Sequence, residues 1–302
     1  MVNDHVVAPD SGRIFVLIPT YNRRNILSAT LTKVREQLPP EIAQIFVVDA
    51  GSTDGTCAEV LQQCPSAEII KGHSDMWWTA TVNHGLKHLA KTARTGDRVL
   101  LMNDDIDLEK QALIRLLEAS SLEPGAIIGA VNIVRRLDEP SRVYFCGGRY
   151  DLYFARHKAN VMAGKLWHES ISRFLQTDFL YGRLLVIPWN AFELGCRFDE
   201  DTFPQYSADE DFSYDAKHRG VQVLVDTKSI VYVNEATTAH FSLSFSKGGW
   251  HGIWKALNAF NSCYNIKQGW AFSKRYAKWP IVFMLCRYAI IFFNENFRIN
   301  QI

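Results

Sequence analysis

Short apolar runs alternate with helically spaced apolar residues through the first two thirds of the chain. Runs of strand length occupy residues 13–18, 44–48, 68–71, 98–102 and 126–131. Between them, apolar spacing predicts helices over 25–38, 55–61, 79–91 and 109–119. Asp54 is a suitable N-cap for the second of these helices. This alternation predicts an α/β fold with a mainly parallel sheet and helices on both faces.

The later part of the chain is less regular. Strands are predicted over 183–187, 221–225 and 229–233, and helices over 189–194 and 209–219. The segment after residue 247 is expected to be helical. In sheets of this class, ligands bind at the carboxyl ends of the strands, so the loops that follow strands are where chemistry is expected.

Composition excludes several classes of protein. Of the 302 residues, 47% are hydrophobic and 22% are charged, which is typical of a globular chain. The net charge of +1 argues against a general nucleic-acid binder. The six cysteines form no CxxC pair, which argues against a zinc site and a disulfide scaffold. Residues 1–12 contain no apolar stretch, so we expect no signal peptide and a cytoplasmic location.

The charge is unevenly distributed. From Lys247 onward there are eight basic residues and one acid, giving +7 and leaving −6 for the rest of the chain. The same segment holds 13 of the 37 aromatic residues. This marks a composition boundary near residues 240–247, and we predict a main domain over residues 1–242 and a basic, aromatic helical extension over 243–302.

Polar residues follow the first two predicted strands. Pro19, Thr20, Tyr21 and Asn22 end the first, and the run 49–56, Asp-Ala-Gly-Ser-Thr-Asp-Gly-Thr, follows the second. A carboxylate beside small hydroxylic residues can bind a nucleobase and ribose. A turn followed by a helix cap explains the same residues equally well.

Acidic residues follow the strand predicted over 98–102. Asn103, Asp104, Asp105 and Asp107 lie at the expected ligand-binding edge, where carboxylates suit a hard divalent cation that also holds phosphate oxygens. The alternative is a solvated acidic turn in which Asp107 caps the next helix.

A second acidic group, Asp209, Glu210 and Asp211, opens a predicted helix. Acids in a first turn favour the helix dipole, but one of them could equally be a general base. His240 is a lone histidine and is of interest only because an acidic metal candidate exists elsewhere.

Together these motifs resemble family 2 glycosyltransferases of the GT-A fold. The resemblance covers about residues 13–242 and includes Gly182 through Phe192, the run 195–200 and the acids at 209–211. The pair Trp77-Trp78 ahead of Asn83-His84-Gly85 resembles the bacterial surface-polysaccharide branch, including rhamnosyltransferase-like members.

The resemblance implies a role for each of these positions. The residues expected to bind the donor nucleotide are Pro19, Thr20, Tyr21, Asn22, Asp49, Ser52, Trp78, Asn83, Asn103 and Asp104. Asp105 and His240 would hold the metal, Mn²⁺ or Mg²⁺. Asp209 would be the base, with Asp211 as second choice. The residues expected at the sugar or acceptor are Gly182, Trp189 and Glu210. The chain departs from the family pattern at Asn103, in the first acidic position of the DxD motif, and at Ala208, where the family has Glu.

The implied activity is inverting, metal-dependent transfer of a sugar in bacterial surface-polysaccharide synthesis. The donor would be a dTDP- or UDP-sugar, and the acceptor a glycan or a polyprenyl-diphosphate-linked saccharide. Two alternatives remain open: an inactive relative that binds sugar nucleotides or glycans, and a sugar-phosphate nucleotidyltransferase. The second is the weaker alternative, because this sequence lacks the Gly-rich, Arg-containing opening loop that is usual in such enzymes.

The apolar run 279–293 has 15 residues with Arg287 near its middle, whereas a membrane-spanning helix needs about 20. Its basic and aromatic neighbours suit the headgroup layer of an anionic membrane. Packing on the catalytic domain or a homodimer contact would explain the same residues.

Overall fold

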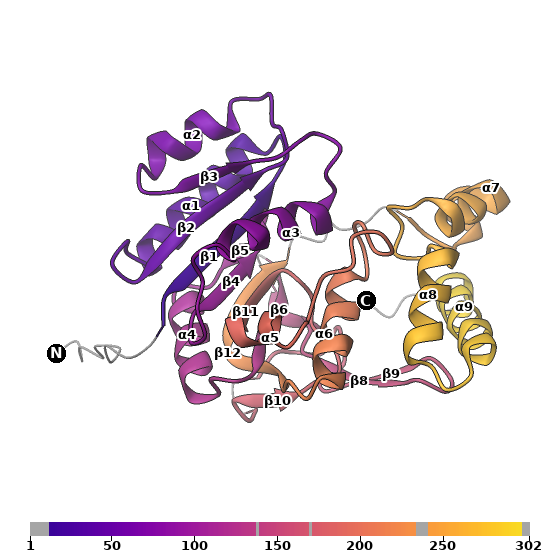
Figure 1. Ribbon diagram of the computed structural model, residues 1–302. Coiled ribbons are helices and arrows are strands. Elements are labelled where there is room, and N and C mark those ends of the chain that lie inside the picture. Colours follow the sequence, from indigo (N-terminus) through magenta and orange to yellow (C-terminus); the bar gives the residue numbers. More distant parts are fainter. Residues whose placement is uncertain (1–11, 137–138, 169–170, 234–240, 298–302) are drawn as a thin grey trace.

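A ten-stranded mixed sheet forms the centre of the protein (Figure 1). The computed structural model describes residues 12–136, 139–168, 171–233 and 241–297. The strands follow the order β10–β12–β6–β11–β4–β1–β2–β3, with β5 paired to β12 and β7 to β6. Their bounds are β1 (Ile14–Thr20), β2 (Ala43–Asp49), β3 (Glu68–Lys71), β4 (Arg98–Met102), β5 (Asp107–Leu108), β6 (Ile127–Arg136), β7 (Glu139–Phe145), β10 (Phe174–Gln176), β11 (Leu184–Pro188) and β12 (Val223–Val233).

The strands that bear on the site are β1 to β4 and β11. The first four run parallel in the order β4–β1–β2–β3, whereas β11 is antiparallel to both β4 and β6. The expected α/β class with a mainly parallel sheet is confirmed. A separate hairpin pairs β8 (Gly148–Asp151) with β9 (Arg156–Ala159).

Helices cover both faces of the sheet because successive side chains of a strand point to opposite sides. Val16 and Ile18 of β1 lie in one core, against α1, α2 and α4. Phe15 and Leu17 lie in the other core, against α3, α5 and α6. The helix bounds are α1 (Arg24–Gln37), α2 (Thr56–Gln63), α3 (Trp78–Leu89), α4 (Ala112–Leu122), α5 (Trp189–Glu193) and α6 (Ala208–His218). The continuous apolar run of β1 is thus explained by burial on both faces.

The structure differs from the sequence-based expectation at three element boundaries. The helix expected from residue 109 begins at Ala112, because the preceding chain pairs with β12 as β5. The two strands expected over 221–225 and 229–233 form the single strand β12, with a register shift between Asp226 and Ile230. Asp54 is not the N-cap of α2. That position is Gly55, with φ +88°, and the Asp54 carboxylate accepts the backbone N–H of Thr56 at 3.0 Å.

Three helices form the C-terminal part of the chain and stand beside α6 and the β8–β9 hairpin (Figure 1). They are α7 (Phe245–Asn258), α8 (Ile266–Tyr276) and α9 (Pro280–Phe297). Phe272 and Phe283 are buried in the same core as α5 and α6, so part of this segment packs on the catalytic fold. Among the helices within the described ranges, none combines the length and apolar character needed to cross a bilayer.

Candidate active site

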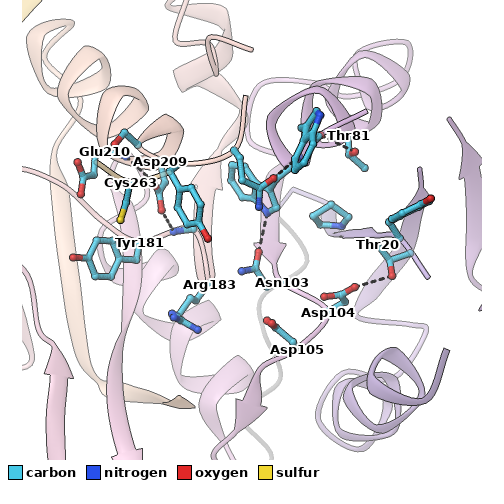
Figure 2. Close-up of a pocket in the computed structure, with 18 of the residues that line it drawn as sticks. Thr20, Thr81, Asn103, Asp104, Asp105, Tyr181, Arg183, Asp209, Glu210 and Cys263 are labelled. Carbon is cyan, nitrogen blue, oxygen red and sulfur yellow. Dashed lines mark hydrogen bonds between the residues drawn. The ribbon is translucent and has the colours of Figure 1, made fainter. Parts of the chain in front are cut away.

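A pocket of about 700 Å³ opens at the edge of the sheet where β1 and β4 end and β11 begins (Figure 2). Segments far apart in the sequence line it. The contributing residues are Pro19, Thr20, Tyr21, Arg23, Ala50, Met76, Trp77, Trp78, Thr81, Asn103, Asp104, Asp105, Tyr144, Tyr181, Gly182, Arg183, Gln205, Tyr206, Ser207, Asp209, Glu210, Cys263, Tyr264 and Arg287. The pocket therefore combines the loops after parallel strands with the start of α6 and the C-terminal helices.

One side of the pocket carries a carboxylate pair bound to an arginine. The Arg23 guanidinium donates to Asp105 at 2.7 Å and to Asp104 at 3.2 Å. The Thr20 hydroxyl donates to the other oxygen of Asp104 at 2.7 Å. Burial raises the pKa of Asp104 to about 6, although Arg23 and Thr20 oppose the shift. Asp105 is the more accessible of the two carboxylates, with 16% of its side chain exposed against 8% for Asp104.

Trp78 links the loop after β4 to the start of β11. Its indole N–H donates to the Asn103 side-chain oxygen at 2.9 Å. A Cβ atom at position 182 would lie only 2.9 Å from the Trp78 ring, so glycine is needed there for the two segments to approach. The Asn103 side chain, which occupies the first position of the predicted DxD counterpart, is therefore held by the indole.

The opposite side of the pocket carries Asp209 and Glu210 at the start of α6 (Figure 2). The Asp209 carboxylate accepts the backbone N–H of Gly182 at 2.7 Å and that of Glu210 at 3.0 Å. Burial raises the pKa of Asp209, while these two N–H groups oppose the shift. Burial also raises the pKa of Glu210, to about 7, although the positive charge of Arg287 opposes it. The raised pKa of each carboxyl favours its proton-holding form, and for Glu210 the pKa lies near neutral pH.

Asp211 lies outside this pocket and is bound to the C-terminal helices. Its carboxylate accepts two hydrogen bonds of 2.9 Å from Arg275 of α8 and one of 2.9 Å from the Tyr276 hydroxyl. The side chain is 3% exposed. These contacts leave it no access to a bound substrate.

Asp49, Asn22 and Ser52 form a hydrogen-bonded network beside pocket residues 19–21 and Ala50. Asp49 accepts the Ser52 N–H at 3.0 Å, and the Ser52 hydroxyl accepts the Asn22 N–H at 2.8 Å. The Asn22 side chain in turn accepts the Thr53 N–H at 2.8 Å, with Asn22 itself at φ +50°. Ala50 lines the pocket, but Asn22, Asp49 and Ser52 do not. Their side chains instead hold together the loops that follow β1 and β2.

Other predicted site residues lie away from the pocket. β11 is antiparallel to β4, so the chain enters β11 at the pocket, through Gly182 and Arg183, while Trp189 follows its last residue, at the opposite edge of the sheet. The Asn83 side chain donates to the Phe198 carbonyl at 2.9 Å and to Glu200 at 2.7 Å. The structure does not bring Trp189 or Asn83 to the pocket. His240 lies outside the described residues.

Sequence reasoning missed several residues that line the pocket. Arg23 and Arg183 directly follow residues that it selected, Asn22 and Gly182, so adjacency was an available signal. Cys263, Tyr264 and Arg287 come from the C-terminal extension. No local pattern marks these three residues as part of a site.

The residues present suit a divalent cation only in company with a ligand. No group of three or more His, Cys, Asp or Glu side chains placed to hold a metal occurs within the described ranges. Mg²⁺ and similar cations bound with nucleotides commonly use one or two carboxylates, the remaining ligands being phosphate oxygens and water. Asp105 and Asp104 supply such a pair, so the donor set fits a cation that arrives with a diphosphate.

Many solved structures are similar to this fold, and two of them illustrate the likeness at low sequence identity. A mannosyltransferase from Pyrobaculum calidifontis, PcManGT, solved with GDP-Man and Mn²⁺, is 18% identical over 95% of this chain and 72% of its own, with a TM-score of 0.58. GalNAc-T7, solved with UDP, GalNAc and Mn²⁺, is 15% identical over 74% of this chain, with a TM-score of 0.57. The chain spans 44% of the length of that GalNAc-T7 chain.

The match to a protein family is more direct. A search of curated proteins gave no significant match. The family described as "Glycosyl transferase family 2" matches residues 15–175, which is more than half of the chain and includes β1, β4 and the carboxylate pair. The chain therefore belongs to glycosyltransferase family 2 and has the GT-A fold.

Proposed function

We propose that the protein transfers a sugar from a nucleoside-diphosphate sugar to a hydroxyl group of an acceptor. The observation that carries this proposal is the division of one pocket between two carboxylate groups. Asp104 and Asp105 lie on one side, with Asp209 and Glu210 across from them (Figure 2). A donor diphosphate and an acceptor hydroxyl need such opposed sites, because the hydroxyl attacks the anomeric carbon from the side opposite the leaving group.

The donor nucleotide is assigned to the end of the pocket formed by Pro19, Thr20, Tyr21 and Ala50. Asp49, Asn22 and Ser52 would support this end through their mutual hydrogen bonds. The nucleotides bound in the structures of GalNAc-T7 and PcManGT, UDP and GDP-Man, support nucleoside-diphosphate chemistry without selecting the base. The rhamnosyltransferase-like motif at Trp77 and Trp78 favours a dTDP- or UDP-sugar.

Asp105 would hold the divalent cation, Mn²⁺ or Mg²⁺, with Asp104 beside it; the resemblance adds His240. When bound, the cation offsets the negative charge that develops on the diphosphate as the sugar leaves. Arg23 already binds both carboxylates, so its guanidinium must share or yield these oxygens. An arginine there can also donate to the departing phosphate.

Asp209 is the proposed base. Its carboxylate is oriented by the N–H groups of Gly182 and Glu210, and burial raises its pKa. It would take the proton of the acceptor hydroxyl as that oxygen attacks, and the configuration at the anomeric carbon would invert. Asp211 is a poor second choice because Arg275 and Tyr276 occupy its oxygens.

The acceptor is proposed to be a glycan or lipid-linked saccharide of a bacterial surface polysaccharide. Exposed aromatic and aliphatic side chains on α7 and α9, such as Trp250, Trp254 and Leu285, support contact between the C-terminal extension and a membrane surface. The extension also packs against the catalytic domain through Phe272 and Phe283. We also propose that residues 243–302 form this extension as a unit separate from the catalytic domain.

The test of donor binding is calorimetry with UDP, dTDP and GDP, each with and without Mn²⁺. We expect at least one nucleotide to bind, and to bind at least tenfold more tightly with Mn²⁺. Asp105→Ala should remove the effect of Mn²⁺. Asp107→Ala is the matched control, since Asp107 lies two residues further on, in β5, and binds Lys33. Failure of all three nucleotides to bind would refute the proposal, and equal affinity without metal would refute the metal site.

A second candidate function is sugar-nucleotide binding without turnover. The Asn103 side chain, in the first acidic position of the motif, is held by Trp78, and Ala208 replaces the glutamate of the family pattern. Release of nucleoside diphosphate from a bound sugar nucleotide, measured with and without saccharide acceptors, separates the two. Binding with no release under any condition would favour the non-catalytic function.

A further inference from the structure

Arg287 is a half-buried cation on the acceptor side of the pocket, and none of the described residues forms a hydrogen bond or an ion pair with it. It comes from α9 and lines both the main pocket and a smaller adjoining cavity, which Glu210, Tyr150 and Phe272 also line. Its Nε atom is buried and has no hydrogen-bond partner. Within the described ranges, no carboxylate lies within ion-pair distance of its guanidinium.

The other pocket arginines are placed differently. Arg23 on the donor side is neutralised by two carboxylates. Arg183, beside Gly182, lies over the ring of Tyr144 at 5.5 Å, so an aromatic face accompanies its charge. Arg287 alone of these three has neither an ion pair nor a ring contact among the described residues.

A guanidinium in this setting favours an anion. It has five N–H donors in a planar fork that matches carboxylate and phosphate oxygens, and leaving its buried Nε–H without an acceptor is costly. Glu210 balances it only in part, because burial raises the pKa of Glu210 to about 7 and the group is partly protonated at neutral pH. A ligand anion would supply the missing hydrogen bonds.

We infer that Arg287 forms an anion-binding subsite in the acceptor half of the pocket, and that the acceptor carries a phosphate or carboxylate group near the hydroxyl that is glycosylated. This inference rests on the proposed function, since it identifies the far half of the pocket as the acceptor site. Arg287 interacts electrostatically with Glu210 and Cys263, and Glu210 directly follows the proposed base, whereas the donor diphosphate is assigned to the carboxylate pair that Arg23 binds. The anion is thus distinct from the donor diphosphate.

Two sources of this anion share the same chemistry. One is the phosphate of a prenyl-linked acceptor, and the other is the carboxylate of an acidic sugar. The same helix, α9, exposes Ile281, Leu285 and Phe293 to solvent, which gives it an apolar outer side that a prenyl chain could contact. The probes below separate the two sources.

The experiment measures binding of small probes to the full chain by calorimetry, with the donor site saturated by the nucleoside diphosphate that binds best together with Mn²⁺. The probes are geranyl phosphate, methyl β-glucuronide and the neutral methyl β-glucoside. We expect one anionic probe to bind at least tenfold more tightly than the glucoside. Arg287→Gln should weaken that probe at least tenfold and leave nucleotide affinity within twofold. Arg287→Lys should retain part of the affinity.

Arg149→Gln is the matched control, because Arg149 is exposed on β8 and does not line the pocket. If Arg287→Gln does not fold, Glu210→Gln serves instead, since removal of the competing carboxylate should tighten the anionic probe severalfold at pH 8. Nucleotide binding without any preference for an anionic probe would overturn the inference and leave the proposed function intact. An anionic probe whose affinity is unchanged in both Arg287→Gln and Glu210→Gln would also overturn the inference. If no nucleotide binds, the proposed function fails, and the same probes on the nucleotide-free protein still test whether Arg287 binds anions.

Discussion

The Arg23 guanidinium lies 2.7 Å from a carboxylate oxygen of Asp105, the residue proposed to hold the metal. A second contact, at 3.2 Å, joins it to Asp104. A divalent cation and Arg23 therefore compete for the same oxygens until a diphosphate supplies further ligands.

Replacement of Arg23 should strengthen metal binding in the absence of nucleotide. Arg23→Gln removes the competing charge, so we expect the affinity for Mn²⁺ alone to rise about threefold to tenfold, as measured by calorimetry or by the free Mn²⁺ signal in electron paramagnetic resonance. Arg24→Gln is the control, because the neighbouring arginine binds Glu59 instead. Unchanged or weaker binding in Arg23→Gln would show that Arg23 does not oppose the cation.

Asp209→Asn should separate turnover from donor binding. The N–H groups of Gly182 and Glu210 bind different oxygens of Asp209, so the amide can accept only one of them. Because it also cannot take a proton, transfer should fall by ~10²–10⁴-fold while nucleotide affinity is unchanged. Asp215→Asn is a matched control on the same helix, where Asp215 binds Arg219 at the surface. Near-normal transfer by Asp209→Asn would refute its assignment as the base.

Asp211 is expected to act on stability. Asp211→Asn weakens its bonds to Arg275 and Tyr276 and should lower the free energy of unfolding by about 2 kcal/mol, the usual scale for hydrogen bonds to charged groups. The measurement is urea unfolding, with Arg275→Met and the double variant completing a cycle. If the losses in unfolding free energy of the two single variants sum to that of the double variant, Asp211 and Arg275 do not stabilise the contact between α6 and α8. Loss of transfer without loss of stability would return Asp211 to the list of candidate bases.

Glu210 should make stability fall as the pH rises. Its pKa is raised from 4.5 to about 7 in the folded protein, so between these values the folded state holds a proton that the unfolded state has lost. The protonated Glu210 therefore contributes its full stabilisation below pH 4.5. This contribution to the free energy of unfolding is lost as the pH rises from 4.5 to about 7, at up to about 1.4 kcal/mol per pH unit. Glu210→Gln should therefore become more stable relative to the wild type between pH 5 and pH 8. Glu193→Gln, on the exposed side of α5, should show no such trend.

The C-terminal helices should hold the protein on anionic vesicles. Trp250 and Trp254 are 76% and 65% exposed on α7, so replacing both with serine should reduce co-sedimentation with anionic liposomes at low salt. Truncation is a poor test, because it would remove Phe272 and Phe283 from the core. Leu122→Ser, an exposed position on α4, is the control. Absence of the wild type from the pellet at low salt would exclude this role.

The local pattern of apolar and polar residues by itself determined most of the strands and the loops that line the donor side of the site. The apolar runs predict β1 to β4, and the strand rule places the loops that follow them at one edge of the sheet, which brings Thr20 and Asp104 together. Periodicity carries this information because the exposure of a side chain in a strand or helix repeats over two to four residues. The family resemblance rests on the same loops.

Only the tertiary structure decided the partners of those loops. Asp209 and Asp211 read alike in the sequence, yet one faces the pocket and the other is bound by Arg275, 64 residues away. Trp189 directly follows a predicted strand, but the antiparallel direction of β11 carries it to the opposite edge of the sheet. Arg287 enters the pocket from the last helix. Such contacts depend on strand direction and on packing between distant segments, and neither leaves a periodic trace in the chain.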